Sequence, residues 1–548
     1  MACLLMLGLL SYGPARAGSQ VEVKHAPYLQ LGDAVLARLP GSETDQIEIL
    51  WQTIPAGPGA LDSFAVEFRE AAAPDWTAAG PIFTIDTRVG GRINHFVTIK
   101  ELQYDRDYDY RVVHHRSGIA IETYDGSFRT RLPAGADAAF TFAAYGDSAR
   151  IAQVRNFRNV QSRINLIDPD FSVLLGDNVY DRGTHSQFDA RLDPVINPEL
   201  HQYIAGHVEY WSMGNHDAAT AGGQPSLDNY SVPVPVAGTT SPVPPPLGEA
   251  PEKNYSFDYG NVHFATFDSN SLNHAARLDS QLDWLVADMN ASEAHWKSVF
   301  AHHPVAGSPD KQESPGDDYY KQVVSRLNEA DVDLFLAGYS HLYHRTFPLL
   351  GQSGGAALFV PDLDHDYSKG AGLIQVVSGV GGRSLRIGDF SPYPFDVVGF
   401  SLSTVPRVEY GFAKIDVSPG ELEVSYIAAD NGAILDAFTI SDRRADVNDD
   451  LAIDSLDITP FILAMSVGGN VRDALGVDTF LNLVPDGSFS AADINFDRSV
   501  NNLDITPFIG LLAGAAAVPE PSAALALLTL AGLMFRRQSR TPRTTKTV

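Results

Sequence analysis

The chain has 548 residues, of which 44% are hydrophobic and 19% are charged, so it is globular and long enough for about two to four domains. It contains 67 Asp and Glu residues against 39 Lys and Arg residues, which gives a formal net charge of -28. This negative surplus argues against nucleic acid or an anionic membrane surface as a main partner, and it suits cation binding.

The N-terminal segment from Met1 to Ala17 is an apolar run that ends in Ala15-Arg16-Ala17. This pattern predicts a secretory signal over residues 1–17 and export of the mature protein. Cys3, the only cysteine, lies within the run. The mature protein would therefore have no thiol, which excludes disulfides and thiolate metal sites and leaves His, Asp, Asn and Tyr as the metal ligands.

Residues 26–133 contain short runs of alternating apolar and polar residues separated by turn residues, a pattern typical of a β-sandwich of roughly a hundred residues. Leu102, Tyr104 and Tyr108 resemble the tyrosine corner of fibronectin type III-like domains. We find no candidate catalytic cluster in this segment, so we expect it to act as a scaffold or as a wall on the substrate side. The clearest predicted strands are 47–51, 64–68, 95–99 and 108–113.

From residue 138 to residue 441, predicted strands alternate with predicted helices, which indicates an α/β domain built from βαβ units. Helical periodicity covers residues 154–167 and 278–289, and residues 254–268 predict two paired strands. Five further predicted strands each end in residues that could bind a metal. They are 140–145 before Gly146-Asp147, 171–175 before Gly176-Asp177-x-x-Tyr180, 210–213 before Gly214-Asn215-His216-Asp217, 297–301 before His302-His303, and 332–337 before Gly338-Tyr339-Ser340-His341.

The run from Phe171 to Tyr180 shows how such a strand can deliver ligands. Gly176 lets the backbone turn sharply, so Asp177 and Tyr180 can point into the crevice at the carboxyl edge of a parallel sheet, where such sheets bind ligands. An ordinary strand and turn would explain this run if it stood alone. Five strand ends of this kind in one domain favour a shared metal site.

The five motifs occur in the order found in calcineurin-like metallophosphoesterases. The tyrosine of the second motif and the preceding β-sandwich resemble the purple acid phosphatase branch of that family, and the resemblance covers roughly residues 27–440. It implies hydrolysis of phosphate monoesters or small diesters. This reaction needs a hydroxide nucleophile and neutralisation of the phosphoryl oxygens, which two cations ~3.5–4 Å apart can supply.

The resemblance also implies roles for individual residues. Asp177 would bridge the two metals, and His216 would act as an acid or an oxyanion partner near the leaving group, so these two residues are the catalytic candidates. A tyrosine ligand implies Fe³⁺ in the first position, beside a divalent ion such as Fe²⁺, Zn²⁺ or Mn²⁺ in the second. The first metal would be held by Asp147, Asp177, Tyr180 and His341, and the second by Asp177, Asn215 and His302.

Position 339 departs from the family's pattern. The last motif of the family ends in Gly-His-x-His, and its first histidine completes the shell of the second metal, but the residue here is Tyr339. Loss of this nitrogen donor would weaken the second site unless the phenol or another group, such as His344, replaces it. His303 is a further candidate for contact with substrate. Two functions stay open, a phosphate-ester hydrolase and a catalytically weakened surface protein that binds phosphate or another ligand.

Residues 445–513 contain a duplicated motif, in which oxygen-bearing side chains at loop positions 1, 3, 5, 9 and 12 precede the segment LDITPFI. Ca²⁺ takes oxygen ligands at such positions, and the pair resembles the calcium loops of a dockerin, a small α-helical module of the EF-hand type. The module would recruit a cohesin-like partner or act as a calcium-rigidified spacer. The predicted calcium ligands are Asp446, Asn448, Asp450, Asp454 and Asp457 in the first loop, and Asp493, Asn495, Asp497, Asn501 and Asp504 in the second.

The C-terminal segment, residues 518–541, contains Val518-Pro519-Glu520-Pro521, an apolar run from Ala523 to Phe535, and then Arg536-Arg537. This order resembles a PEP-CTERM sorting signal, which implies attachment to the cell envelope after export. The apolar run is shorter than the ~20 residues that span a bilayer comfortably, so a weakly inserted terminal apolar helix is the alternative.

Overall fold

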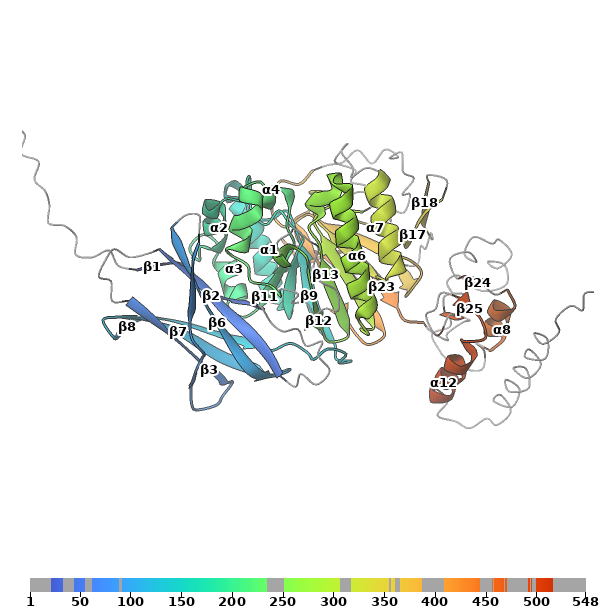
Figure 1. Ribbon diagram of the computed structural model, residues 1–548, viewed down its shortest axis with the longest axis horizontal. Helices are drawn as coiled ribbons and strands as arrows, with labels where there is room; N and C mark the ends of the chain where they lie inside the picture. The colour runs from blue at the N-terminus through green and yellow to red at the C-terminus, as the bar shows by residue number, and fades with distance from the viewer. Residues whose placement is uncertain are drawn as a thin grey trace, which may run out of the picture.

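The computed structural model (Figure 1) describes residues 21–32, 44–54, 62–87, 91–233, 251–305, 317–353, 356–359, 365–386, 409–443, 456, 458–467, 469–470, 491–492, 494 and 499–515. The predicted signal over residues 1–17 and the predicted sorting tail over residues 518–541 lie outside these ranges. Among the helices within them, none is long and apolar enough to cross a membrane.

The N-terminal domain consists of two four-stranded antiparallel sheets. Their inner faces share one core, to which Trp51 and Val97 contribute from one sheet and Val66 and Val112 from the other. The predicted N-terminal sheet domain is therefore present. The first sheet runs β1 (Glu22–Gln30), β2 (Thr44–Ile54), β6 (Arg92–Gln103), β5 (Phe83–Thr87), and the second runs β4 (Thr77–Ala78), β3 (Asp62–Glu70), β7 (Asp107–Arg116), β8 (Ile119–Arg129).

The segment that resembles a tyrosine corner folds back on itself. The Tyr108 hydroxyl accepts a hydrogen bond of 3.0 Å from the backbone N–H of Gln103, five residues upstream. Such a bond between a buried tyrosine and the preceding corner is the feature that defines a tyrosine corner. The closer likeness to fibronectin type III domains stays a prediction.

The central domain stacks two mixed sheets face to face, as predicted for an α/β domain. Phe142 and Phe171 of one sheet lie edge-on to Phe264 of the other, with ring centroids 5.2 and 5.6 Å apart. The first sheet runs β11 (Val208–Trp211), β10 (Phe171–Leu174), β9 (Phe140–Tyr145), β21 (Gly411–Val417), β22 (Glu421–Ala428), β23 (Ile434–Ser441), β19 (Asp366–Ser368). The second runs β12 (Tyr255–Tyr259), β13 (Val262–Thr266), β14 (Trp296–Ala301), β15 (Leu334–Ala337), β20 (Ile374–Ser378), β16 (Tyr343–Arg345).

Helices cover the outer faces of these sheets (Figure 1). Helix α1 (Val154–Ile167), which the sequence predicts to the residue, packs Phe157, Val160 and Ile164 into the core of the first sheet. Helix α6 (Ala275–Ala291) packs with α7 (Asp317–Glu329) on the second sheet through Leu282, Val323 and their neighbours. Strand β17 (Leu349–Ser353) pairs antiparallel with β18 (Ala356–Phe359). The other helices among the described residues of the domain are η1 (Ile151–Gln153), α2 (His185–Leu192), α3 (Pro198–Ile204), α4 (Asn215–Ala218), η2 (Ala221–Gly223), α5 (Gln224–Leu227), η3 (Pro251–Lys253) and η4 (Ser269–Asn273).

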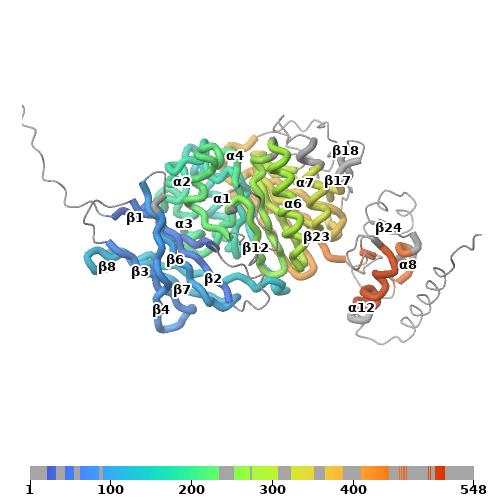
Figure 2. Tube along the Cα trace, viewed as in Figure 1, coloured from blue at the N-terminus to red at the C-terminus, as the bar shows by residue number. Residues whose placement is uncertain are grey.

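Parallel pairing decides where the polar strand ends meet. Strands β9, β10 and β11 are parallel, as are β13, β14, β15 and β20. Figure 2 traces the chain from the blue N-terminal sheets into the green and yellow central domain that contains these strands. Their carboxyl ends lie at one edge of the stacked sheets, because the backbone N–H of Gly146, after β9, donates to the carbonyl of Ser378 at the end of β20. This edge carries all five predicted motifs.

Within its described residues, the C-terminal unit contains two helices, α8 (Ile458–Val467) and α12 (Ile505–Ala515), that begin at equivalent points of the repeated segment. Phe461 and Phe508, which are also equivalent, stack with ring centroids 3.9 Å apart. Strand β24 (Gly469–Asn470) pairs with β25 (Ser499–Val500). The internal repeat therefore corresponds to two similar helices that share a core.

Two of the predicted calcium ligands, Asn501 and Asp504, lie within the described residues. The buried Asp504 carboxylate accepts hydrogen bonds of 2.8 Å from the backbone N–H groups of Ile494 and Asn501, which ties the second loop to the start of α12. Calcium binding by this module stays a prediction. The other predicted ligands, Asp446, Asn448, Asp450, Asp454, Asp457, Asp493, Asn495 and Asp497, lie outside the described residues.

Candidate metal centre

Two carboxylates form the middle of the site. Asp147 and Asp177 follow β9 and β10, and both adopt left-handed backbone conformations, with φ of 54° and 51°. The two turns are joined, because the N–H of Asp147 donates to the carbonyl of Gly176 at 3.0 Å and the N–H of Ser148 donates to the carbonyl of Asp177 at 3.1 Å. Both aspartates are buried, so their charges need a cation or a proton close by.

Two glycines are required by the close approach of these turns. Gly176 has a φ of 79°, and a Cβ atom there would lie 2.5 Å from Nδ1 of His302. A Cβ atom on Gly214 would lie 2.0 Å from the backbone nitrogen of Asp177. Contacts this short do not occur between real atoms, so any side chain at either position would displace a predicted ligand.

The first donor set consists of Asp147, Tyr180 and His341. The Tyr180 hydroxyl donates to Asp147 Oδ1 at 2.7 Å and lies 3.4 Å from Nε2 of His341. That Nε2 atom lies 3.2 Å from the same Asp147 oxygen. Burial, reinforced by the charges of Asp147 and Asp177, raises the pKa of the Tyr180 phenol well above its usual value. Without a cation the phenol therefore keeps its proton.

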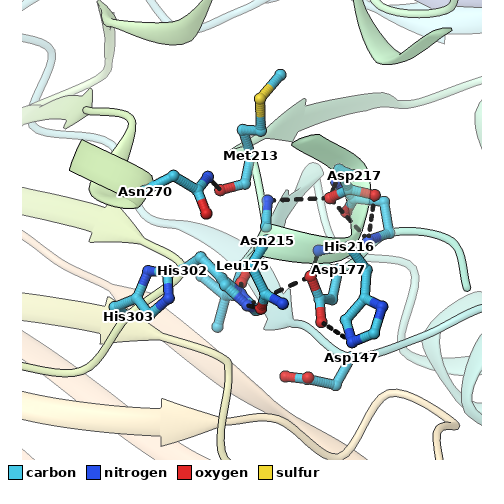
Figure 3. Close-up of polar contacts among 12 residues, drawn as sticks. Asp147, Leu175, Asp177, Met213, Asn215, His216, Asp217, Asn270, His302 and His303 are labelled. Carbon is cyan, nitrogen blue, oxygen red and sulfur yellow. Dashed lines mark hydrogen bonds and ion pairs between the residues drawn. The ribbon is translucent and has the colours of Figure 1, made fainter. Parts of the chain in front are cut away.

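The second donor set consists of Asp177, Asn215 and His302 (Figure 3). Nε2 of His302 lies 3.1 Å from Oδ1 of Asn215 and 3.3 Å from Oδ1 of Asp177. Besides burial, the negative charge of Asp177 also helps to raise the pKa of the Tyr180 phenol, which belongs to the first set. Ligand atoms of Asp147, Asp177 and His302 all lie within 4.8 Å of one another.

Backbone carbonyls orient both histidines toward the site. Nδ1 of His302 donates to the carbonyl of Leu175 and Nδ1 of His341 donates to the carbonyl of Ser384, each at 2.9 Å. The Nε2 atoms are thereby left as the acceptors that face the carboxylates. Metal-ligating histidines are held in this way, since the second nitrogen fixes the tautomer and the ring orientation.

His216 lies at the rim of the site. Its Nδ1 donates to the carbonyl of Asp181 at 2.6 Å, which leaves Nε2, 3.8 Å from Oδ2 of Asp177, directed at the centre. The imidazole packs on the Tyr180 ring with centroids 4.6 Å apart and stays partly exposed. A partly exposed imidazole beside buried carboxylates is suited to contact a bound substrate.

The three further candidates occupy different places. The Tyr339 ring lies edge-on to the His302 ring, with centroids 5.4 Å apart, and at a tilt to the His303 ring, with centroids 4.5 Å apart, so it adjoins the second donor set. His303 lies 2.9 Å from the Ser269 hydroxyl, which favours a supporting position over direct ligation. His344 lies on β16, paired in register with Val377 of β20, and its role as a substitute ligand stays a prediction.

Asp217 has a supporting role that the motif did not reveal. Its buried carboxylate accepts hydrogen bonds from the backbone N–H groups of Asn178, Val179 and Gly214, so it joins the second and third strand ends. Burial, followed by the charge of Asp177, raises the pKa of Asp217 to about 7. The sequence marks this residue only as part of a motif, because the groups it binds are backbone atoms.

The donors present fit a pair of metal ions. Carboxylate, phenol, amide and imidazole groups suit iron, zinc and manganese, and the chain offers them in two adjoining sets with a shared carboxylate. Repulsion between two buried aspartates would be relieved by cations between them. The observations that carry this fit are the grouped ligand atoms and the two histidine orientations.

Part of the chain is similar to known proteins. Residues 140–343 match the family described as calcineurin-like phosphoesterase. The chain is 23% identical over 422 residues to an uncharacterized protein of Mycobacterium tuberculosis, which covers 64% of this chain and 76% of the relative. It is also 23% identical over 257 residues to purple acid phosphatase 1 of Ipomoea batatas, which covers 46% of this chain and 51% of that protein.

The fold resembles that of purple acid phosphatase PPD1 from yellow lupin (Lupinus luteus), with a TM-score of 0.59 and 20% sequence identity over 76% of this chain and 75% of the lupin chain. This likeness extends well beyond the segment matched by the family. The chain thus carries a calcineurin-like phosphoesterase domain in a purple acid phosphatase-like fold, and it is accordingly a phosphoesterase enzyme.

Proposed function

We propose that the protein is an exported hydrolase of phosphate esters that works with two metal ions, Fe³⁺ in the first donor set and a divalent ion in the second. The observation that carries the proposal is the grouping of Asp177 with Asp147 of the first set and His302 of the second, since ligand atoms of the three residues lie within 4.8 Å of one another. A shared carboxylate at this point is what a binuclear centre needs.

Each donor set would hold one ion. Asp147, Tyr180 and His341 would hold the first, Asn215 and His302 the second, and Asp177 both. Bound ions would supply Lewis acidity toward the phosphoryl oxygens and an activated nucleophile at moderate pH. Tyr180 would have to release its proton on loading, which makes binding of the first ion weaker at low pH.

The other steps belong to the chain's own residues. His216 has Nδ1 fixed by the Asp181 carbonyl, so Nε2 is the atom that would donate a proton to the leaving oxygen or a hydrogen bond to a phosphoryl oxygen. The carbonyls of Leu175 and Ser384 hold the two ligand histidines in place, which limits reorganisation when substrate binds.

A second candidate function rests on Tyr339. The second set has three donors, Asp177, Asn215 and His302, among the described side chains. The family's pattern has one more histidine at this point, so the second set would bind its ion more weakly than the first. A chain that retained only the first ion would bind phosphate without efficient hydrolysis. The dockerin-like and sorting segments would keep such a protein at the envelope and, through a cohesin-like partner, in an assembly.

Substitution of Asp177 tests the proposed activity. We expect Asp177→Ala to reduce metal-dependent release of nitrophenol from nitrophenyl phosphate by more than the ~10²–10³-fold that loss of one transition-state donor costs. The matched control is Asp181→Ala, which removes a neighbouring carboxylate but keeps the backbone carbonyl that holds His216. Full activity in Asp177→Ala would exclude the proposed centre.

A further inference from the structure

A buried arginine contacts both turns that carry the central carboxylates. Nη1 of Arg191, on helix α2, donates to the Ser148 hydroxyl at 3.0 Å and to the Asn178 carbonyl at 3.2 Å. Ser148 directly follows Asp147 in the sequence. Asn178 directly follows Asp177. The Ser148 hydroxyl also donates to the same Asn178 carbonyl at 3.1 Å, so these three groups form one junction between the two turns.

The charge of Arg191 is matched by a carboxylate outside the metal centre. Nη2 of Arg191 lies 3.2 and 3.1 Å from the two carboxylate oxygens of Glu209, on β11. The Arg191 side chain is fully buried, and that of Glu209 is 2% exposed. Because the pair as a whole carries no net charge, Arg191 does not serve as the counter-ion of Asp147 and Asp177. Its effect on these two residues is one of position.

Tyr145 connects the same network to the strand that precedes Asp147. The Tyr145 hydroxyl donates to Oε1 of Glu209 at 2.6 Å and accepts from the side-chain amide of Gln161, on α1, at 2.8 Å. Tyr145 is the last residue of β9, two positions before Asp147. The chain is therefore held by one set of buried polar groups on both sides of Asp147, and the junction joins the turn of Asp177 to it.

Helix α2 is itself held from two directions. The side-chain amide of Asn197 donates to the carbonyl of Arg191 at 3.0 Å. Asp189, two residues before Arg191, lies 2.9 Å from Nε2 of His25 on β1 and also pairs with Arg92 on β6 of the N-terminal domain. Both the backbone and the guanidinium of Arg191 are thus fixed, as a group that positions other residues needs to be.

We propose that Arg191 is a positioning residue of the metal centre, which fixes the two ligand turns and thereby the separation of the Asp147 and Asp177 carboxylates. Both aspartates have left-handed backbone conformations, which cost free energy that the surrounding contacts must offset. The junction supplies such contacts at the residue after each aspartate. The inference rests on the proposed two-metal centre, because its consequence is the affinity of that centre for its ions.

Titration of Zn²⁺ into the metal-free full-length chain, followed by calorimetry, measures this affinity without reference to turnover. Binding that disappears in Asp177→Ala reports the centre. Arg191→Lys keeps the positive charge beside Glu209 but lacks the planar fork that reaches Glu209 and both turns at once. We expect it to weaken Zn²⁺ binding by at least ~10-fold, the lower end of the effect of losing a group that holds a metal ligand.

The matched control is Arg131→Lys. Arg131 is also buried and lies 2.6 Å from the carboxylate of Asp45 on β2, outside the turns that carry the ligands. We expect this change to lower the thermal unfolding midpoint of the metal-free chain, as Arg191→Lys does, but to leave the Zn²⁺ affinity unchanged. A purely structural role for Arg191 would lower the midpoint in both variants and the affinity in neither.

Ser148→Ala tests the junction if Arg191→Lys does not fold, since it removes one acceptor and leaves the pair of Arg191 with Glu209 in place. We expect a loss of Zn²⁺ affinity of about 10-fold. Two results would overturn the inference, and they are distinguishable. If the wild type shows no Zn²⁺ binding that depends on Asp177, the proposed metal centre fails as well. If the wild type binds Zn²⁺ in this way and the folded variants bind it equally well, the positioning role alone is excluded.

Discussion

The two donor sets of the metal centre are built on the same plan but are not equally complete. Each combines a carboxylate with a histidine whose Nδ1 is held by a backbone carbonyl. The first adds the buried Tyr180 phenol, whereas the second adds the Asn215 amide and has Tyr339 where the family's pattern has histidine. We therefore propose that the first set, with its phenol, holds its ion more tightly than the second set does, and that binding of the second ion limits the activity.

Removal of a histidine from either set should show the difference in metal binding between the two sets most clearly. We expect His341→Ala to lose the first ion and, because the sets share Asp177, most of the second, with a fall in kcat larger than ~10³-fold. His302→Ala should lose the second ion and retain the first. Metal content of the two purified variants by mass spectrometry checks this order, and equal loss of both ions in both variants would contradict the asymmetry.

The His216 side chain belongs to neither set, and its removal should leave both ions in place. Since Nε2 is the free nitrogen, His216→Gln should lower kcat by ~10²–10⁴-fold, the usual contribution of a positioned acid or base. The pH profile of kcat is the measurement, together with metal content. If the variant has normal metal content and neither the acidic nor the basic limb of its pH profile changes, a proton-transfer role for His216 is excluded.

Restoring the missing histidine should strengthen the weaker set. Tyr339 already packs against the His302 ring, so Tyr339→His places a nitrogen donor beside the second set. We expect the affinity for the second ion to rise by at least ~10-fold, the size of effect that a single group has on metal affinity. Titration of the divalent ion against activity measures it, with Tyr339→Phe as control. Unchanged affinity would mean that another group completes the set.

The smallest effect on kcat is expected from a substitution at the rim of the metal centre. Arg150 holds the Asp181 carboxylate at 3.1 Å through a partly exposed ion pair, and the Asp181 carbonyl orients His216. Exposed pairs contribute up to ~1 kcal/mol, so Arg150→Gln should lower kcat by no more than ~5-fold and leave metal affinity unchanged. Steady-state kinetics at saturating metal check this, and a loss of metal would show that the pair supports the donor sets instead.

Much of the site could be predicted because ligands at the ends of parallel strands leave a signal in the sequence. The glycine and acid after β9 and β10 marked Asp147 and Asp177, and the structure brings both to one edge of the stacked sheets. Placement of the side chains is what the structure adds. Their roles as ligands stay predictions until a metal is measured.

Contacts made through backbone atoms could not be predicted in the same way. The carbonyls of Leu175 and Ser384 orient the two histidines, yet any residue at these positions supplies a carbonyl. The same holds for the amides bound by Asp217. The antiparallel strands β21 to β23 were also missed individually, because the pattern of alternating strands and helices describes only the parallel part of the domain.

The central claim is that one chain holds two ions of unequal affinity and hydrolyses phosphate esters with both. The most direct test is to count metals per chain in the purified full-length protein while nitrophenyl phosphate turnover is followed as a divalent ion is added. We predict a first ion that survives dialysis, a second that is acquired on addition, and turnover that rises with the second. One tightly held ion with no turnover at any divalent concentration would contradict this account.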